Sequence, residues 1–271
     1  MQILEPKVIL LASTHMDPAA LDRLKDEIGA HEYPSPGSNG EALIEVGGRL
    51  CYRSFQPGLN KNVTKVRTDS FEYIKNILAQ KHGSVLEHAT VTFVILNCSR
   101  VFTHEVVRHR AGVAISQESM RYVRLDNIGM YYPQVFGSQI PDKILQAKIR
   151  QIFERVVRTS EIAIEEISQL LGIDDVGKPF DFKKKVTSAM RRLAPGGHTT
   201  NIMLTANHRA WRHILKVRTG EGVEEEMWPI MKEIGSQLKA SCPLIYQDMF
   251  LDIDPTGKRK SEGWKFEFDK V

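Results

Sequence analysis

Apolar residues follow two different periods along the chain, which predicts a mixture of helices and strands. Between positions 147 and 171 they recur about every 3.6 residues, as on one face of a helix, and Gly172 follows as a terminator. Residues 90–97 are instead a β-branched and aromatic run, which favours a strand. The same reasoning predicts strands at 7–13 and 198–206, and helices at 18–29, 70–81, 182–193, 208–218 and 223–240.

Local chemistry sets several boundaries of these elements. Asp69 and Glu72 have the spacing of a capping box, and Ser99 can cap a helix that runs to about residue 110. Pro229 is expected to disturb the helix at 223–240. Residues rich in Pro, Gly, Ser and Asn predict a loop at 33–41, and the charged and aromatic residues 252–271 predict a peripheral tail.

The order of these elements predicts one domain over residues 1–271. Strands and helices do not alternate regularly enough for a doubly wound parallel sheet, and no internal repeat or linker divides the chain. The sequence has no G-x-G-x-x-G motif, so a dinucleotide cofactor is not expected to be held in the Rossmann manner.

Composition excludes several classes of protein. Apolar residues make up 42% of the chain and charged residues 26%, as in ordinary globular proteins and unlike disordered or collagen-like chains. No window approaches the ~20 apolar residues of a membrane helix, and the apolar run at 8–12 is too short for a signal peptide. We therefore expect a cytoplasmic protein with no membrane partner.

Cysteine usage predicts neither disulfides nor zinc. Cys51, Cys98 and Cys242 are widely spaced, without a C-x-x-C motif, and are interpreted as structural or incidental thiols. His82 and His88 flank Glu87 in one turn, but no further ligand stands at zinc spacing nearby, so no metal site is expected.

The arginines point to anionic ligands. Ten of the 18 arginines lie in two segments, 100–124 and 191–218. Clustered guanidinium forks suit phosphates and carboxylates. A nucleic-acid-binding protein is one alternative, but the net charge is only +4 and aromatic residues do not interleave the clusters.

Three segments carry candidate chemistry. The first runs from the Arg108-His109-Arg110 triplet to Tyr122; within it Gln117, Ser119 and Arg121 would share one face if the segment were extended. The second is the turn 82–88, and the third is 207–213 with Arg218. Taken alone, the first segment is better interpreted as a basic helix end with exposed arginines.

Together the three segments resemble the flavin-dependent thymidylate synthases, the ThyX family. That family has an R-H-R motif followed after seven residues by serine, usually continuing x-R-Y, an upstream turn like His82–His88, and a downstream series of arginines. The downstream series here is Arg191 with Pro195, then Asn207-His208-Arg209, then Arg218. Eight residues separate Arg110 from Ser119, so we place a one-residue insertion in 111–115. The resemblance covers residues 70–245.

The resemblance implies a fold and a reaction. The fold is a single α+β domain, with helices packed on a mostly antiparallel sheet and FAD bound without a Rossmann motif. The reaction is conversion of dUMP to dTMP, with methylenetetrahydrofolate as carbon donor and NADPH-reduced FAD as hydride source. It also implies a homotetramer with shared sites and no nucleic-acid partner. Flavin- and folate-dependent modification of another pyrimidine nucleotide is an alternative.

The resemblance also assigns residues. Arg218 is the catalytic candidate, set against the uracil edge to favour its N3-deprotonated form. Ser119 lacks an adjacent base and is interpreted as a hydrogen-bond donor rather than a nucleophile. The FAD set is Ser84, Arg108, His109, Arg110, Gln117, Asn207, His208, Arg209 and His213. The dUMP set is Glu105, Val106, Val107, Arg108, Gln117, Glu118, Ser119, Met120, Arg121, Arg191 and Arg218.

Overall fold

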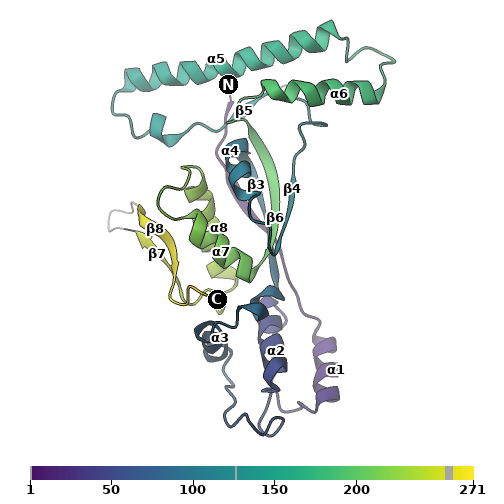
Figure 1. Cartoon of the computed structure of the whole chain (residues 1–271), viewed down its shortest axis with the longest axis vertical. Helices are drawn as coiled ribbons and strands as arrows, with labels where there is room; N and C mark the ends of the chain where they lie inside the picture. The colour runs from purple at the N-terminus through teal and green to yellow at the C-terminus, as the bar shows by residue number, and fades with distance from the viewer. Residues whose placement is uncertain (1, 126, 254–258) are drawn as a thin grey trace.

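A four-stranded antiparallel sheet forms the centre of the computed structural model, which describes residues 2–125, 127–253 and 259–271 (Figure 1). Its strands stand in the order β2, β3, β6, β4, so the long β3 and β6 are the central pair. This arrangement confirms the expected α+β class with a mostly antiparallel sheet. The strands are β2 (Lys7–Ser13), β3 (Thr90–Ser99), β4 (Val113–Gln117) and β6 (Thr199–Asn207).

Helices cover this sheet and build the main hydrophobic core. Phe93 of β3 meets Trp211 of α7 edge to face, with ring centroids 5.3 Å apart, and the Trp211 indole N–H donates to the Val91 carbonyl at 3.1 Å. Both rings are completely buried, which fixes α7 against the sheet. The elements that contribute buried residues to this core are α3 (Ser70–Ala79), η1 (Gly83–Glu87), α4 (Arg100–Val106), α7 (His208–Arg218) and α8 (Met227–Ser241).

Two smaller apolar clusters lie at opposite ends of the molecule. One packs α1 (Pro18–Ile28) and α2 (Gly40–Tyr52) together, and the other lies beneath α5 (Lys143–Leu170) and α6 (Phe180–Met190), which form a long arm (Figure 1). Among the described residues, no helix combines the length and apolar character needed to cross a membrane. Short elements complete this end: β1 (Gln2–Ile3), β5 (Gly129–Met130), η2 (Gln134–Phe136) and η3 (Arg191–Leu193).

Several predicted boundaries differ from the structure for local reasons. The helix capped by Ser99 ends at Val106, and a turn at residues 107–108 leads to His109. Helix α8 begins at Met227, so Pro229 occupies its first turn, where a missing N–H costs nothing, and the expected disturbance is wrong. Helix α2 was not predicted at all.

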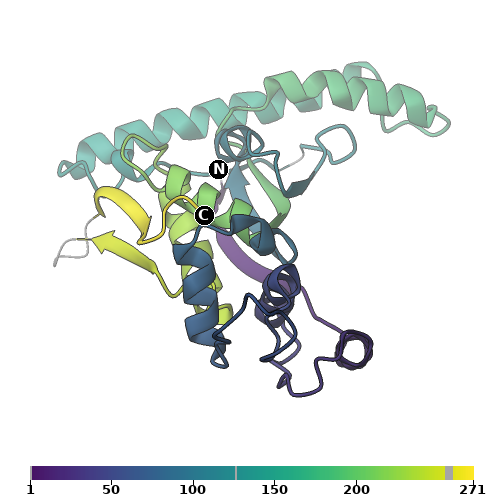
Figure 2. The same cartoon turned by 60° about the horizontal axis from the view of Figure 1, so that its bottom comes forward.

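The predicted peripheral tail is also wrong. Strands β7 (Met249–Ile253) and β8 (Arg259–Phe266) form a hairpin beside α7 and α8, as Figure 2 shows in yellow. Trp264 and Phe266 of β8 are buried in the main core. The C-terminal residues therefore belong to the body of the fold.

Candidate functional site

Two of the predicted motifs meet at Arg218, the last residue of α7. Its Nε donates to Nε2 of His109 at 2.8 Å, and its terminal nitrogens donate to the Glu105 carboxylate at 2.5 Å and the Glu105 carbonyl at 2.7 Å. Glu105 lies near the end of α4 and His109 in the turn that follows it. The Arg218 side chain is only 16% exposed, whereas that of Glu105 is 46% exposed, so the cluster opens to solvent on the carboxylate side.

Electrostatics keep the His109 imidazole neutral. Burial, followed by the positive charge of Arg218 and then His213, lowers the pKa of His109 from 6.5 to about 4. A neutral ring can accept the Arg218 N–H at Nε2 and carries its own proton on Nδ1. The cluster therefore holds a fixed guanidinium, paired with one carboxylate and one neutral acceptor.

Other members of the predicted FAD set lie on α7, on η1 and on either side of His109 in the chain. The ring of His213 on α7 lies beside the ring of His109, with the two ring centroids 5.9 Å apart. Arg209 pairs with Glu87 of η1 at 2.5 Å, and both side chains are half exposed. Ser84, Arg108 and Arg110 are exposed. Glu87 stands in the turn that the sequence singled out but was not predicted as a site residue.

Asn207 is held by backbone geometry at the start of α7. Its Oδ1 accepts the Ala210 N–H at 2.8 Å, which caps the helix. Gly112 approaches it from the loop after the arginine triplet, with a φ of +68° that favours glycine. A Cβ on Gly112 would lie 2.5 Å from Asn207 Nδ2, so this loop can pass close to the cap only as glycine.

The structure does not place every predicted side chain at this surface. His208 is buried in the core and contacts the Tyr246 hydroxyl at 3.0 Å, so its side chain is unsuited to a cofactor contact. Val106 also points into the core, and Met120 packs on the cluster beneath α5. The periodicity of α7 explains His208, because that position starts the buried face of the helix.

The predicted shared face of Gln117, Ser119 and Arg121 is wrong. Strand β4 ends at Gln117, whose amide donates to Thr103 Oγ1 at 2.9 Å. The carboxylate of Glu118, the next residue, accepts from both the backbone and the side chain of Asn201 at 3.2 Å. Ser119 Oγ then accepts the Arg121 N–H at 3.3 Å, which starts a turn. Arg121 is exposed on that turn.

A small polar cavity of about 150 Å³ lies next to this segment. Arg100, Glu118, His198 and Thr200 are among its lining residues. The Nε of Arg100, both ring nitrogens of His198 and the hydroxyl of Thr200 are buried without a hydrogen-bond partner among the described residues. Burial lowers the pKa of Arg100, and the positive charge of Arg191 adds a smaller lowering effect. Sequence motifs did not identify Arg100 or His198, because only tertiary packing brings them together.

The predicted site residues thus form two groups. One comprises Arg218 with His109, Glu105 and the FAD-set residues of α7 and η1, and the other comprises residues 118–121 with Arg191. Within the part of the chain that the structure describes, no hydrogen bond or ion pair joins the two groups.

Comparison with known proteins gives consistent results. Residues 35–244 match the family described as thymidylate synthase complementing protein. The chain is 31% identical over 249 residues to a probable flavin-dependent thymidylate synthase of Mycobacterium phage L5, covering 90% of this chain and 97% of the relative. It is also 31% identical over 219 residues to the flavin-dependent thymidylate synthase of Mycolicibacterium gilvum (strain PYR-GCK), covering 80% and 82%.

A solved structure supports the fold. The crystal structure of a UMP/dUMP methylase, PolB, from Streptomyces cacaoi bound with 5-Br UMP superposes with a TM-score of 0.61 at 15% identity, covering 91% of this chain and 95% of that one. The family match, the two relatives and the meeting of the motifs at Arg218 agree. The chain belongs to the flavin-dependent thymidylate synthase family.

Proposed function

We propose that this single-domain protein acts in the cytoplasm as a flavin-dependent thymidylate synthase that methylates dUMP to dTMP. The observation that carries the proposal is the junction of Arg218 with His109 and Glu105. It brings the last arginine of one motif onto the histidine of another, 109 residues earlier in the chain. Family membership favours this enzyme over the nucleic-acid-binding alternative.

The residues around this junction fit the anionic pyrophosphate of FAD. Arg108 and Arg110 are exposed, and neither forms an ion pair within the described residues. Guanidinium groups left free in this way suit phosphate oxygens. Bound FAD would supply the reducing hydride. The residues that would hold it are Ser84, Arg108, His109, Arg110, Asn207, Arg209 and His213, together with Gln117 at the end of β4.

Arg218 acts on the nucleotide by electrostatics. Its guanidinium is already oriented by Glu105 and His109, so it needs little reorganisation to stabilise negative charge on the edge of a uracil ring. A uracil held as the N3 anion is electron-rich at C5, the atom that receives the new carbon. Because Arg218 remains charged throughout, it supports the anion without exchanging a proton.

The second group of residues suits the phosphate of dUMP. Arg121 and Arg191 are exposed, and the cavity lined by Arg100 and His198 contains buried donors without a hydrogen-bond partner among the described residues. An unsatisfied buried donor is costly, and an anionic ligand would remove that cost. Ser119 contributes a hydroxyl at the edge of the same segment. Methylenetetrahydrofolate and NADPH are proposed as co-substrates.

We further propose that the protein is a homotetramer with shared sites. Among the described residues no hydrogen bond or ion pair joins the two groups of site residues, and a second copy of the chain is proposed to complete each site. Helix α5 also exposes apolar side chains that a monomer would leave in water. They are Ile144, Leu145, Ile152, Val156 and Ile162.

The experiment is a reconstituted reaction. Purified protein is incubated with FAD, and its absorbance near ~450 nm, where oxidised flavin absorbs, is recorded after removal of free cofactor. The protein is then mixed with dUMP, methylenetetrahydrofolate and NADPH, and dTMP is quantified, with each component omitted in turn. UMP replaces dUMP in a parallel reaction. Colourless protein that forms no dTMP would refute the proposal, and methylation of UMP alone would favour the other pyrimidine reaction.

A further inference from the structure

The C-terminal hairpin is attached to the residue that follows Arg218. Thr219 is completely buried, and its hydroxyl donates to the Leu215 carbonyl at 2.7 Å while accepting the Trp264 backbone N–H at 2.8 Å. Gly263, with a φ of +46°, crosses so closely that a Cβ there would overlap Thr219. One hydroxyl thus connects the last turn of α7 to β8.

The hairpin side of the molecule also contacts α7 two turns earlier. Arg212 stands seven residues before Thr219, on the same helix face, and is buried. It forms a bidentate ion pair with Asp248 at 2.7 and 2.8 Å and donates to the Phe268 carbonyl at 3.0 Å. The Phe266 ring lies 4.3 Å from the guanidinium carbon. The helix is therefore fixed at two points along one face.

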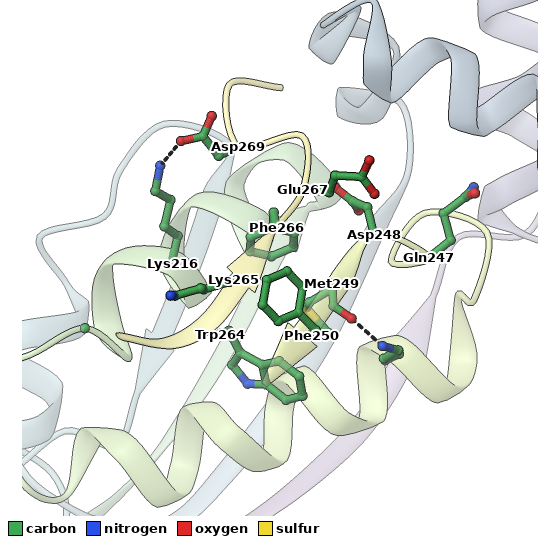
Figure 3. A pocket seen from close by; sticks show the side chains of 12 residues that line it. Lys216, Gln247, Asp248, Met249, Phe250, Trp264, Lys265, Phe266, Glu267 and Asp269 are labelled. Atoms are coloured by element: carbon green, nitrogen blue, oxygen red, sulfur yellow. Dashed lines mark hydrogen bonds and ion pairs between the residues drawn. The ribbon is translucent and has the colours of Figure 1, made fainter. Parts of the chain in front are cut away.

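Trp264 connects the same strand to α8. Its indole N–H donates to the Met231 carbonyl at 3.2 Å, and a Cβ on Gly235 would overlap the indole. Figure 3 shows Trp264 between β8 and the helix below it, at the wall of a cavity of about 780 Å³. Because Trp264 is anchored in α8, its backbone N–H presents a fixed donor to Thr219.

We propose that Thr219 is a positioning residue for Arg218, and that its hydroxyl transmits the placement of the β7–β8 hairpin to the guanidinium. Arg218 must reach His109 Nε2 and two oxygens of Glu105 at once, and it extends from the terminal turn of α7, where helix ends fray. The bond from Trp264 to Thr219 holds that turn. The role in turnover rests on the proposed function.

The test compares two substitutions at one position. Thr219→Val keeps the shape but loses the hydroxyl, whereas Thr219→Ser keeps the hydroxyl. We expect Thr219→Val to lower kcat for dTMP formation about 10- to 100-fold, the scale of a misplaced catalytic group, with flavin content unchanged. Thr219→Ser is expected to retain wild-type turnover.

A second readout does not depend on the reaction. The pKa of His109, followed by NMR of labelled histidine, is lowered in the wild type by burial and then by the positive charge of the adjacent Arg218. In Thr219→Val this pKa is expected to rise towards its ordinary value, and in Thr219→Ser to stay low. If the wild type forms no dTMP, the proposed function fails, while the His109 titration still decides the role of Thr219.

The matched control is Thr205→Val, which removes a hydroxyl that contacts Thr92 Oγ1 at 2.8 Å between strands β6 and β3. It is expected to leave kcat and the His109 titration unchanged. If Thr219→Val does not fold, Gly263→Ala displaces β8 from Thr219 and should produce the same losses. The proposal would be overturned by a folded Thr219→Val or Gly263→Ala protein that keeps the wild-type kcat and the low wild-type pKa of His109.

Discussion

Arg218 donates its Nε hydrogen to Nε2 of His109 over 2.8 Å, and this bond joins the end of α7 to the turn after α4. The bond requires a neutral imidazole, and the low pKa of His109 provides one at neutral pH. The same guanidinium contacts the Glu105 carbonyl and carboxylate. Three acceptors in different directions can be reached together only by the planar fork of arginine.

Arg218→Lys should abolish most activity although it preserves the charge. Lysine is a point donor and cannot reproduce the three contacts, so stabilisation of the uracil anion is lost. We expect dTMP synthesis to fall by about 10²- to 10³-fold while bound flavin is retained. Flavin absorbance, dUMP affinity and dTMP formation are compared with the wild type. Near-normal synthesis would show that Arg218 is only a helix-end arginine.

Ser119→Ala should weaken dUMP binding or turnover without eliminating turnover. The Ser119 hydroxyl accepts the Arg121 N–H, and no histidine or carboxylate contacts it in the described chain, so no base activates it.

Single Cys→Ser changes are expected to leave activity intact: Cys51 is exposed, Cys98 and Cys242 are buried, and burial raises the pKa of Cys242 to about 11. Steady-state assays measure both. A covalent dUMP adduct on Ser119 or any cysteine would contradict this prediction.

Glu226 should make stability depend on pH. It is completely buried, accepts the Ser99 backbone N–H at 2.6 Å and also contacts the Ser99 hydroxyl. Burial raises its pKa from 4.5 to about 7. The folded protein then binds the proton more tightly than the unfolded chain, so the free energy of unfolding falls as pH rises from about 4.5 to about 7.

The loss over that interval is on the order of 3 kcal/mol at 1.36 kcal/mol per pKa unit. Glu226→Gln has no such proton to lose and should flatten this part of the profile. Urea unfolding at pH 5 and pH 7 measures the difference. Identical pH profiles for the variant and the wild type would assign the dependence to another group.

Charges placed on the exposed face of α5 should dissociate the proposed tetramer. Ile152 and Val156 are each nearly half exposed and lie one turn apart, so burying a glutamate at either position between subunits would be costly. We expect Ile152→Glu and Val156→Glu to lower both the mass measured by light scattering and dTMP synthesis. Gln151→Glu, at an exposed polar position of the same helix, is the control. An unchanged mass in both variants would place the subunit interface elsewhere.

The sequence predicted the elements whose conformation is set by local features such as a capping residue and a regular apolar face. Helix α7 runs over the predicted residues because Asn207 caps it and its buried face is continuous. Helix α2 escaped prediction because Gly47 and Gly48 lower helix propensity. Both are needed for packing: a Cβ would lie 3.0 Å from His88 at the first and 2.8 Å from the Tyr73 hydroxyl at the second.

Prediction of the site was also limited to features that the local sequence carries, because tertiary packing decides which side chains meet. The resemblance placed Arg218, His109 and Glu105 in one reaction, and the structure brings them into contact. It also assigned His208. This residue is one position before Arg209 on α7, and that step around the helix turns its side chain into the core. The bond between Glu118 and Asn201 had no local indication, since it depends on two separate strands aligning.

The attachment of β8 to Thr219 has a consequence for biosynthesis. Trp264 stands 45 residues after Thr219, so a ribosome releases α7 well before the strand that fixes its end. The sheet and the buried face of α7 can form while synthesis continues, since N-terminal parts fold first. The end of α7 that carries Arg218 is secured only when the final strand emerges. A nascent chain is therefore expected to acquire its fold before its catalytic geometry.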